Sequence, residues 1–199
     1  SFNSFNGIFV SCIKCFLNSL VLGSTGPDIL LGDIIADVET LRFITQDPNA
    51  RNAITYPHGL WPSNTVPYLV DRSIGQAGVK AINEAIADYH KLTCLKFVRR
   101  TTQKNYIRFT DGDGCSSSVG RTARGEQKVN LHQYCWYKGI VIHEIAHAIG
   151  FFHEQSRTDR DSYVNILYQN IEVGKIPGAL HVPFNSITPY RSSVTICTF

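Results

Sequence analysis

The segment from Val141 to Glu154 constrains this chain more than any other stretch. It reads VIHEIAHAIGFFHE and contains the pattern H-E-x-x-H-x-x-G-x-x-H. His143 and His147 are four residues apart, so on a helix they project from one face and can hold one ion. Gly150 can adopt a positive φ, which ends the helix and turns the chain. His153 can then swing back, so the pattern predicts a metal site with three histidine ligands.

Glu144 lies one step round the same helix, where it can reach a metal-bound water rather than the metal. Three protein ligands and a water make the open arrangement of a catalytic zinc site, whereas four ligands usually close a structural site. The alternative is that these histidines are ordinary helix or core residues, because short motifs produce false matches. We favour one Zn²⁺ because five specified positions occur in order within eleven residues, among apolar neighbours.

Composition limits the other classes of function. The chain has 199 residues, 43% of them hydrophobic, and its formal net charge is +3. We therefore expect one globular domain with an appendage, and no nucleic-acid partner. The apolar run from Gly7 to Leu22 is interrupted by Lys14 and is too short for a membrane span. It is interpreted either as the remnant of a secretory signal or as a disordered leader. Cys12 and Cys15 within it have no second pair at zinc-ribbon spacing, so neither a redox nor a zinc role is expected.

Hydrophobic patterning predicts the secondary structure downstream of a polar leader at residues 24–51. A helix is expected from a Ser73 cap to about Leu92, with an apolar stripe at spacings of three and four. Its stripe consists of Val79, Ile82, Ile86 and Tyr89. Strands are expected near residues 64–70, 95–98, 106–109 and 127–131, and either a strand or a turn is expected at residues 163–166. The zinc helix is expected to begin near Lys138.

Two further stretches are interpreted from their turn-forming residues. Asp111 to Gly114 is expected to be a tight turn, because the ligand spacing of a calcium loop does not follow it. From Ile176 onward no regular structure is expected, because prolines at 177, 183 and 189 interrupt the chain.

With these residues in view, the chain resembles the astacin-type metzincin zinc metalloendopeptidases. The run from His143 to Val164 is similar to that family's signature well beyond the metal ligands. Supporting matches are Leu60-Trp61-Pro62, Val66-Pro67-Tyr68, Thr93-Cys94, Phe97-Val98 and Gly114-Cys115. The resemblance covers roughly residues 52–174. It implies a metzincin-like α+β zincin fold, with a twisted, mostly parallel sheet and long helices in the upper lobe, and with an incomplete lower lobe.

The resemblance also implies how the chain is organised and which residues act. It implies a leader or propeptide at residues 1–51 and a peptidase catalytic domain at residues 52–199, of which 175–199 form a divergent tail. The implied zinc ligands are His143, His147 and His153. Glu144 would be the general base, which takes a proton from the zinc-bound water and passes it to the leaving amine. Glu154 matches a residue that binds the ammonium group of the mature N-terminus; a solvated surface carboxylate is the alternative.

The same resemblance implies a latent precursor. Leu30-Leu31-Gly32-Asp33 is similar to the F-x-G-D motif of astacin propeptides, with Leu in place of Phe. Asp33 would take the water position on zinc and remove the nucleophile; the alternative is a plain turn. The implied partners are a protein or peptide substrate and an activating protease that cuts near Arg51.

Cysteines and an exposed strand complete what the resemblance implies. Cys115 and Cys135 match a family disulfide, which indicates a secreted, extracellular setting. Cys94 matches a cysteine whose partner lies late in the domain, where this chain offers Cys197. The segment from Cys115 to Gly120 matches the family's exposed edge strand, to which an extended peptide can add.

The sequence departs from the family pattern near its end. The chain contains no methionine, and Thr195 stands where the family's S-x-M-H-Y turn has Met. Our leading hypothesis is a secreted zinc endopeptidase that is made as a zymogen. A truncated, non-catalytic astacin-like product that binds zinc without turnover is the alternative. A structural or interaction protein anchored by its leader is a third hypothesis, favoured only by the apolar run. Four arginines are interpreted as plain surface charges, and the alternative is that they give a preference for acidic substrates: Arg99, Arg100, Arg121 and Arg124.

Overall fold

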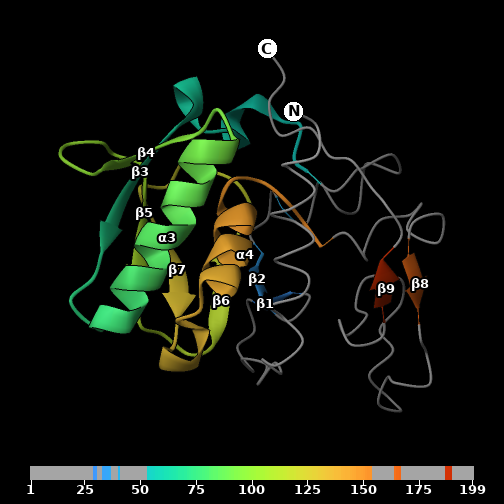
Figure 1. Ribbon diagram of the computed structural model, residues 1–199. Coiled ribbons are helices and arrows are strands. Elements are labelled where there is room, and N and C mark those ends of the chain that lie inside the picture. Colours follow the sequence, from blue (N-terminus) through green and yellow to red (C-terminus); the bar gives the residue numbers. More distant parts are fainter. Residues whose placement is uncertain are drawn as a thin grey trace.

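The computed structural model describes residues 33–36, 40 and 53–153, and the backbone of residues 29–30, 164–166 and 187–189. Within this part of the chain, two helices lie side by side on one face of a seven-stranded sheet (Figure 1). The strands are β1 (Ile29–Leu30), β2 (Ile34–Ile35), β3 (Thr65–Val70), β4 (Lys96–Arg99), β5 (Tyr106–Thr110), β6 (Cys115–Ser118) and β7 (Glu126–Leu131). Their order in space is β1-β2-β6-β7-β5-β3-β4.

The sheet is mostly parallel, as the family resemblance implied. Strand β3 runs parallel to β4 and β5, β5 runs parallel to β7, and β2 runs parallel to β6. Only the β1–β2 and β6–β7 pairs are antiparallel. The α+β class expected from the sequence is confirmed. A separate antiparallel pair joins β8 (Val164–Ile166) to β9 (Ile187–Pro189).

Helix α3 (Gln76–Leu92) packs through the expected apolar stripe. Ile82, Ile86 and Tyr89 are buried, and Val79 is partly buried against the same core. The Tyr89 hydroxyl donates a hydrogen bond of 2.9 Å to the Ile142 carbonyl and so ties α3 to the neighbouring helix. The predicted Ser73 cap is wrong, because the helix begins after Gly75, which makes no side-chain cap.

The residues around Ser73 form a turn instead of a helix cap. The Asp71 carboxylate accepts a hydrogen bond from the Ser73 amide, and the Ser73 hydroxyl accepts one from the Asp111 amide. The side chain that looked like a cap therefore joins the turn after β3 to the turn after β5. Within residues 111–114, where a tight turn was expected, the chain bends at residues 113–114, and Gly114 has φ of +78°.

Helix α4 (Lys138–Ala148) is buried on almost every side. Its apolar residues share one core with the inward faces of the sheet and with α3. Two partners satisfy carbonyl groups at its C-terminal end, where a helix leaves acceptors unpaired. The Trp61 indole N–H donates to the Ala148 carbonyl at 2.8 Å, and the Gly120 amide donates to the His147 carbonyl at 2.8 Å. These bonds allow the helix to end inside the protein.

Two other expectations about the strands need correction. The segment at Cys115 to Gly120 is not a free sheet edge, because β2 from the leader pairs with β6, with Ile34 opposite Ser117 and Ile35 opposite Ser118. Strand β9 ends at Pro189, in a region where proline predicted no regular structure. Proline is tolerated at a strand end because the amide it lacks need not join the ladder there.

The cysteine expectations are confirmed only in part. A disulfide joins Cys115 to Cys135, with their Cα atoms 6.0 Å apart. Cys94 is also disulfide-bonded, but Cys197, its expected partner, lies outside the described residues, as do Cys12 and Cys15.

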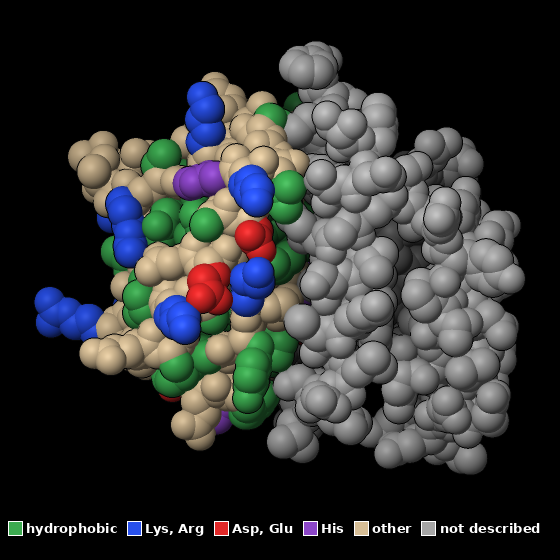
Figure 2. Space-filling model, in the orientation of Figure 1, with side chains coloured by type: hydrophobic (Ala, Val, Ile, Leu, Met, Phe, Trp, Pro, Cys, Tyr) green, Lys and Arg blue, Asp and Glu red, His purple; other side chains and the backbone are tan. Residues whose placement is uncertain are grey.

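The surface view gives no sign of a concentrated basic patch on the face it draws. Figure 2 shows Lys and Arg side chains spread over the described part of this face, with acidic side chains among them. Within the same described residues, no helix has the length and apolar character needed to cross a membrane.

Candidate metal centre

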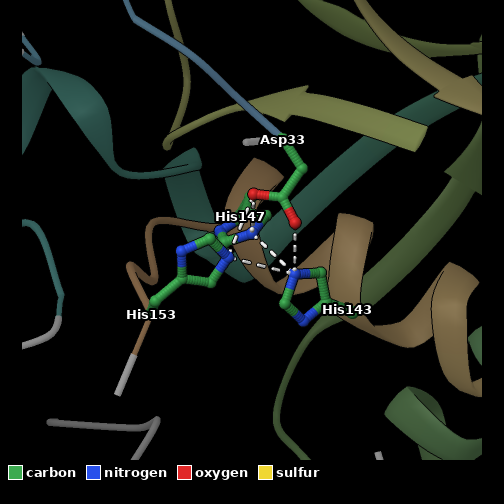
Figure 3. A group of neighbouring side chains, drawn as sticks. All are labelled: Asp33, His143, His147 and His153. Atoms are coloured by element: carbon green, nitrogen blue, oxygen red, sulfur yellow. Dashed lines mark hydrogen bonds and ion pairs between the residues drawn. The ribbon is translucent and has the colours of Figure 1, made fainter. Parts of the chain in front are cut away.

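Three histidines and one aspartate converge beside the C-terminal half of α4. His143 and His147 project from that helix, His153 returns after the turn at Gly150, and Asp33 reaches in from the start of β2 (Figure 3). Each residue offers one ligand atom, and the four atoms all lie within 4.8 Å of one another. The fold therefore brings together the residues that the sequence singled out, including the one from the leader.

Gly150 makes the return of His153 possible. Its φ is +116°, a conformation that residues with a side chain rarely adopt. Its amide donates to the His147 carbonyl at 2.8 Å, and the Phe151 amide donates to the Ala146 carbonyl at 3.0 Å. The chain thus reverses direction directly after α4, as the glycine in the motif predicted.

A segment near the expected processing point packs onto this turn. Ala53 forms an antiparallel bridge with Phe151, and the Ile54 amide donates to the Gly150 carbonyl at 2.9 Å. The Ile54 side chain fills the space over Gly150, where an added β-carbon would lie 2.6 Å from Ile54 Cγ1. It also lies against Gly120. Sequence reasoning missed this role for Ile54, because a lone isoleucine carries no signal of which glycines it will meet.

One histidine has a tautomer fixed by its surroundings. His147 Nδ1 lies 2.7 Å from the Phe151 carbonyl oxygen, which can only accept, so Nδ1 carries the hydrogen. The Nε2 atom therefore presents its lone pair to the other histidines. Burial, together with the neighbouring His143, lowers the pKa of His147 to about 3, so the ring stays neutral at physiological pH. Sequence reasoning missed this partner because a backbone carbonyl leaves no trace in residue identity.

The separations between ligand atoms fit a small cation. The Nε2 atom of His143 lies 2.9 Å from that of His147 and 3.3 Å from that of His153. The Asp33 carboxylate is 3.0 Å from the Nε2 atoms of His143 and His153, and 3.7 Å from that of His147. A tetrahedral zinc with bonds of about 2.0–2.1 Å separates its ligand atoms by about 3.3 Å. The nitrogen-and-carboxylate set and its spacing therefore fit Zn²⁺.

Asp33 is held in its ionised form. Burial alone raises the pKa of its carboxyl group, but the charge of His153 and hydrogen bonds from His143 and His153 outweigh that effect and hold the pKa well below its usual range. A carboxylate is a good oxygen ligand for zinc. The leader residue is therefore chemically ready to complete a four-ligand set.

Glu144 lies beside this group, on the same helix as His143 and His147. It is fully buried, and within the described residues neither carboxylate oxygen has a hydrogen-bond partner. Burial, and then the charge of Asp33, raise the pKa of Glu144 well above its usual value. A buried carboxyl group without partners is costly to maintain, and groups of this kind concentrate at sites of chemistry.

Comparison with known proteins identifies the family. Residues 53–190 match the model of the Astacin peptidase family. The chain belongs to the astacin family. It is 40% identical over 146 residues to zinc metalloproteinase nas-4 of Caenorhabditis elegans, covering 72% of this chain and 46% of that relative. It is 42% identical over 133 residues to blastula protease 10 of Paracentrotus lividus, covering 63% of this chain and 22% of that relative.

A solved structure supports the same assignment of the astacin fold. High choriolytic enzyme 1, a hatching enzyme zinc-protease from Oryzias latipes, superposes with a TM-score of 0.52 at 30% identity. The superposition covers 72% of this chain and 83% of that one. By contrast, the chain spans less than half the length of the two relatives compared above. The comparisons thus show the expected family and fold class. The metal of that family, zinc, is also the one that fits the site described above.

The structure does not describe the residues expected to form the processing point and its partner, and one of the arginines expected at the surface makes hydrogen bonds to the backbone. Glu154, Arg51 and Asn52 lie outside the described residues. Arg121 is anchored to the protein: its side-chain Nε donates to the Leu60 carbonyl at 2.9 Å, and its amide donates to the Gly59 carbonyl at 2.7 Å.

Proposed function

We propose that this chain is a latent zinc endopeptidase of the astacin type, in which the leader masks the site. The observation that carries the proposal is the convergence of Asp33 with three histidines next to a buried Glu144, whose carboxylate has no hydrogen-bond partner among the described residues. Our assignment makes His143, His147 and His153 the ligands of one Zn²⁺. Zinc, when bound, supplies a Lewis acid that polarises a carbonyl oxygen and makes water more acidic.

The carboxylate of Glu144 is proposed as the general base. Burial raises its pKa, so this carboxylate accepts a proton more readily than an exposed one does. In peptide hydrolysis, a Glu144 oxygen takes a proton from the attacking water and then delivers it to the nitrogen of the leaving amine. Burial favours this role because no surrounding hydrogen bond competes for the carboxylate oxygens among the described residues.

Latency is proposed to act through Asp33 and the strand that follows it. The Asp33 carbonyl accepts a hydrogen bond of 2.9 Å from the Ser117 amide, and β2 pairs with β6. An extended peptide substrate would add to that strand by the same kind of backbone bonding. In this proposal, the leader takes the fourth ligand position with Asp33 and covers, with β2, the edge of β6 to which a substrate would add.

Activation is proposed to follow a cut near Arg51, which separates the leader (residues 1–51) from the catalytic domain (residues 52–199). The contacts of Ala53 and Ile54 with the turn before His153 support a role for the new N-terminal segment in holding the third histidine. Glu154 is the proposed partner of the Asn52 ammonium group. The Cys115–Cys135 disulfide supports secretion, because such bonds persist in oxidising compartments.

The test is to express the full chain and to measure zinc content and peptide cleavage before and after the leader is cut. We expect one zinc per chain in both states and cleavage only after the cut. Glu144→Ala should retain zinc and lose cleavage, whereas Asp33→Ala should cleave slowly before the cut, because β2 still pairs with β6, and at the full rate after it. A cut wild-type chain that binds zinc and cleaves nothing would establish the non-catalytic alternative. Unchanged zinc content in His143→Ala, His147→Ala and His153→Ala would refute the ligand assignment.

A further inference from the structure

The leader contributes a second buried group directly after Asp33. Ile34 is 0% exposed, and its backbone pairs with Ser117 of β6. It belongs to an apolar cluster that is separate from the main core and that we call the Ile34 cluster. The Ile34 cluster consists of Ile34, Ile54 and Val119, with Tyr56 and Phe152 packed against them.

The members of this cluster come from the leader, the start of the catalytic part, the residue after β6 and the turn before His153. Ile54 lies at the start of the catalytic part, Val119 follows β6, and Phe152 immediately precedes His153. All members except Ile34 lie downstream of the proposed cut. Loss of the leader therefore removes one apolar side chain from the cluster, next to the strand on which a peptide would lie. Apolar surface left without its cover favours another apolar group in its place.

We propose that the Ile34 cluster is a specificity site that accepts an aliphatic, preferably β-branched, side chain of the substrate, at a position adjacent to the cleaved bond. This inference rests on the proposed peptidase function. In peptides that add to a sheet edge, backbone hydrogen bonds supply affinity, and sites for alternate side chains supply specificity. The substrate residue that pairs with Ser117 takes the place of Ile34, one residue from the position that faces the histidines.

The apolar character of the Ile34 cluster determines which class of substrate side chain it accepts. Its described members are aliphatic and aromatic. Ile54 is fixed by its packing against Gly120 and Gly150, so it bounds the cluster firmly on one side. A charged substrate side chain would be desolvated there without a partner, which is unfavourable. The site therefore selects isoleucine or valine over aspartate or lysine.

The first test needs no enzymatic activity and uses the intact full chain. Hydrogen exchange of the Ser117 amide reports how firmly the leader strand is held, because that amide donates to Asp33. We expect Ile34→Val to exchange at nearly the wild-type rate, and Ile34→Ala and Ile34→Asp to exchange about tenfold faster or more. Ile35→Ala is the matched control, since its partly buried side chain lies outside the cluster, and should change the rate by less than about threefold. Equal exchange in all four variants would overturn the inference.

The second test compares cleavage of a mixed peptide pool by wild type and by Val119→Ala after the leader is cut. Wild type should show isoleucine and valine enriched at one position beside the cleaved bond, and Val119→Ala should shift that preference toward leucine and phenylalanine. Leu60→Ala changes an exposed side chain and serves as the control. Cleavage without an aliphatic preference would overturn the inference and leave the proposed function standing. If wild type cleaves nothing, the proposed function fails, and the exchange series alone decides whether the cluster holds an aliphatic side chain.

Discussion

Gly150 offers the sharpest test of how packing positions the third histidine. Replacing it by alanine has two separable effects. The first is backbone strain, because φ is +116° at this position, and such strain costs about 1–3 kcal/mol. The second is a steric clash, because the new β-carbon would lie 2.6 Å from Ile54 Cγ1 and 3.0 Å from Ile54 Cδ1. Overpacking of this kind costs about 1–3 kcal/mol.

The two effects can be divided by a double-mutant cycle with Ile54→Ala. That change alone should cost about 2–5 kcal/mol, because Ile54 is buried against three glycines. It also removes the clash at Gly150, since the Ile54 β-carbon, which an alanine keeps, would be 3.9 Å from the new atom. In the Ile54→Ala background, Gly150→Ala should therefore cost only the strain, about 1–3 kcal/mol. The coupling free energy should be about 1–3 kcal/mol and of relieving sign.

Urea unfolding of the full chain, followed by tryptophan fluorescence, measures these free energies. Both tryptophans, Trp61 and Trp136, lie in the described part of the chain and pack against the main core. A chelator should be present, because a bound metal would add its own stabilisation. If Gly150→Ala costs the same free energy in both backgrounds, Ile54 does not clash with it and the packing argument is refuted. A cost below about 0.5 kcal/mol in the wild-type background would refute the strain argument as well.

Three other perturbations test contacts that hold the site's surroundings. Tyr89→Phe should cost about 1 kcal/mol in urea unfolding, because it removes a buried hydrogen bond to the Ile142 carbonyl of α4; an unchanged midpoint would show that the bond contributes nothing. Replacing Cys115 and Cys135 together by serine should cost about 3 kcal/mol, because the bond closes a loop of 20 residues; equal stability of the variant and the wild type would contradict this. Hydrogen bonds from the Ser73 backbone, and then from Arg108, depress the pKa of Asp71, so its stabilising effect is full above its unfolded value of about 3.9 and fades as pH falls below it. Asp71→Asn should therefore be less stable than wild type at pH 7, and its deficit should shrink as pH falls from about 3.9 toward the depressed pKa of the folded state; a deficit as large at pH 2 as at pH 7 would contradict the assignment.

Much of the local structure could be predicted from the sequence because it depends on short spacings. The apolar stripe of α3, the beginning of α4 and the glycine turn before His153 all follow from side chains that lie within a few residues of one another. The Ser73 cap failed for the opposite reason. A serine before a helical pattern is a good local candidate, but its hydroxyl found a partner at Asp111, 38 residues away.

The same distinction explains the candidate site. His143, His147 and His153 could be grouped from their spacing alone, and Asp33 could be added only through resemblance to a propeptide motif. The pairing of β2 with β6 could not be foreseen, because leader and strand are more than 80 residues apart and either could have paired elsewhere. The carbonyl that sets the His147 tautomer belongs to the backbone of Phe151 and is independent of residue type.

The sequence by itself determined the chemistry of this protein: three imidazoles and a glutamate at fixed offsets on one helix and its turn. Covalent spacing dictates that arrangement, so any chain that forms α4 and turns at Gly150 will present it. Only the tertiary structure decided what surrounds those groups. Long-range packing put Asp33 among the histidines, left Glu144 buried without a partner among the described residues, and gathered Ile34, Ile54 and Val119 beside them. Those features depend on which distant segments share a surface, and local sequence patterns do not specify that.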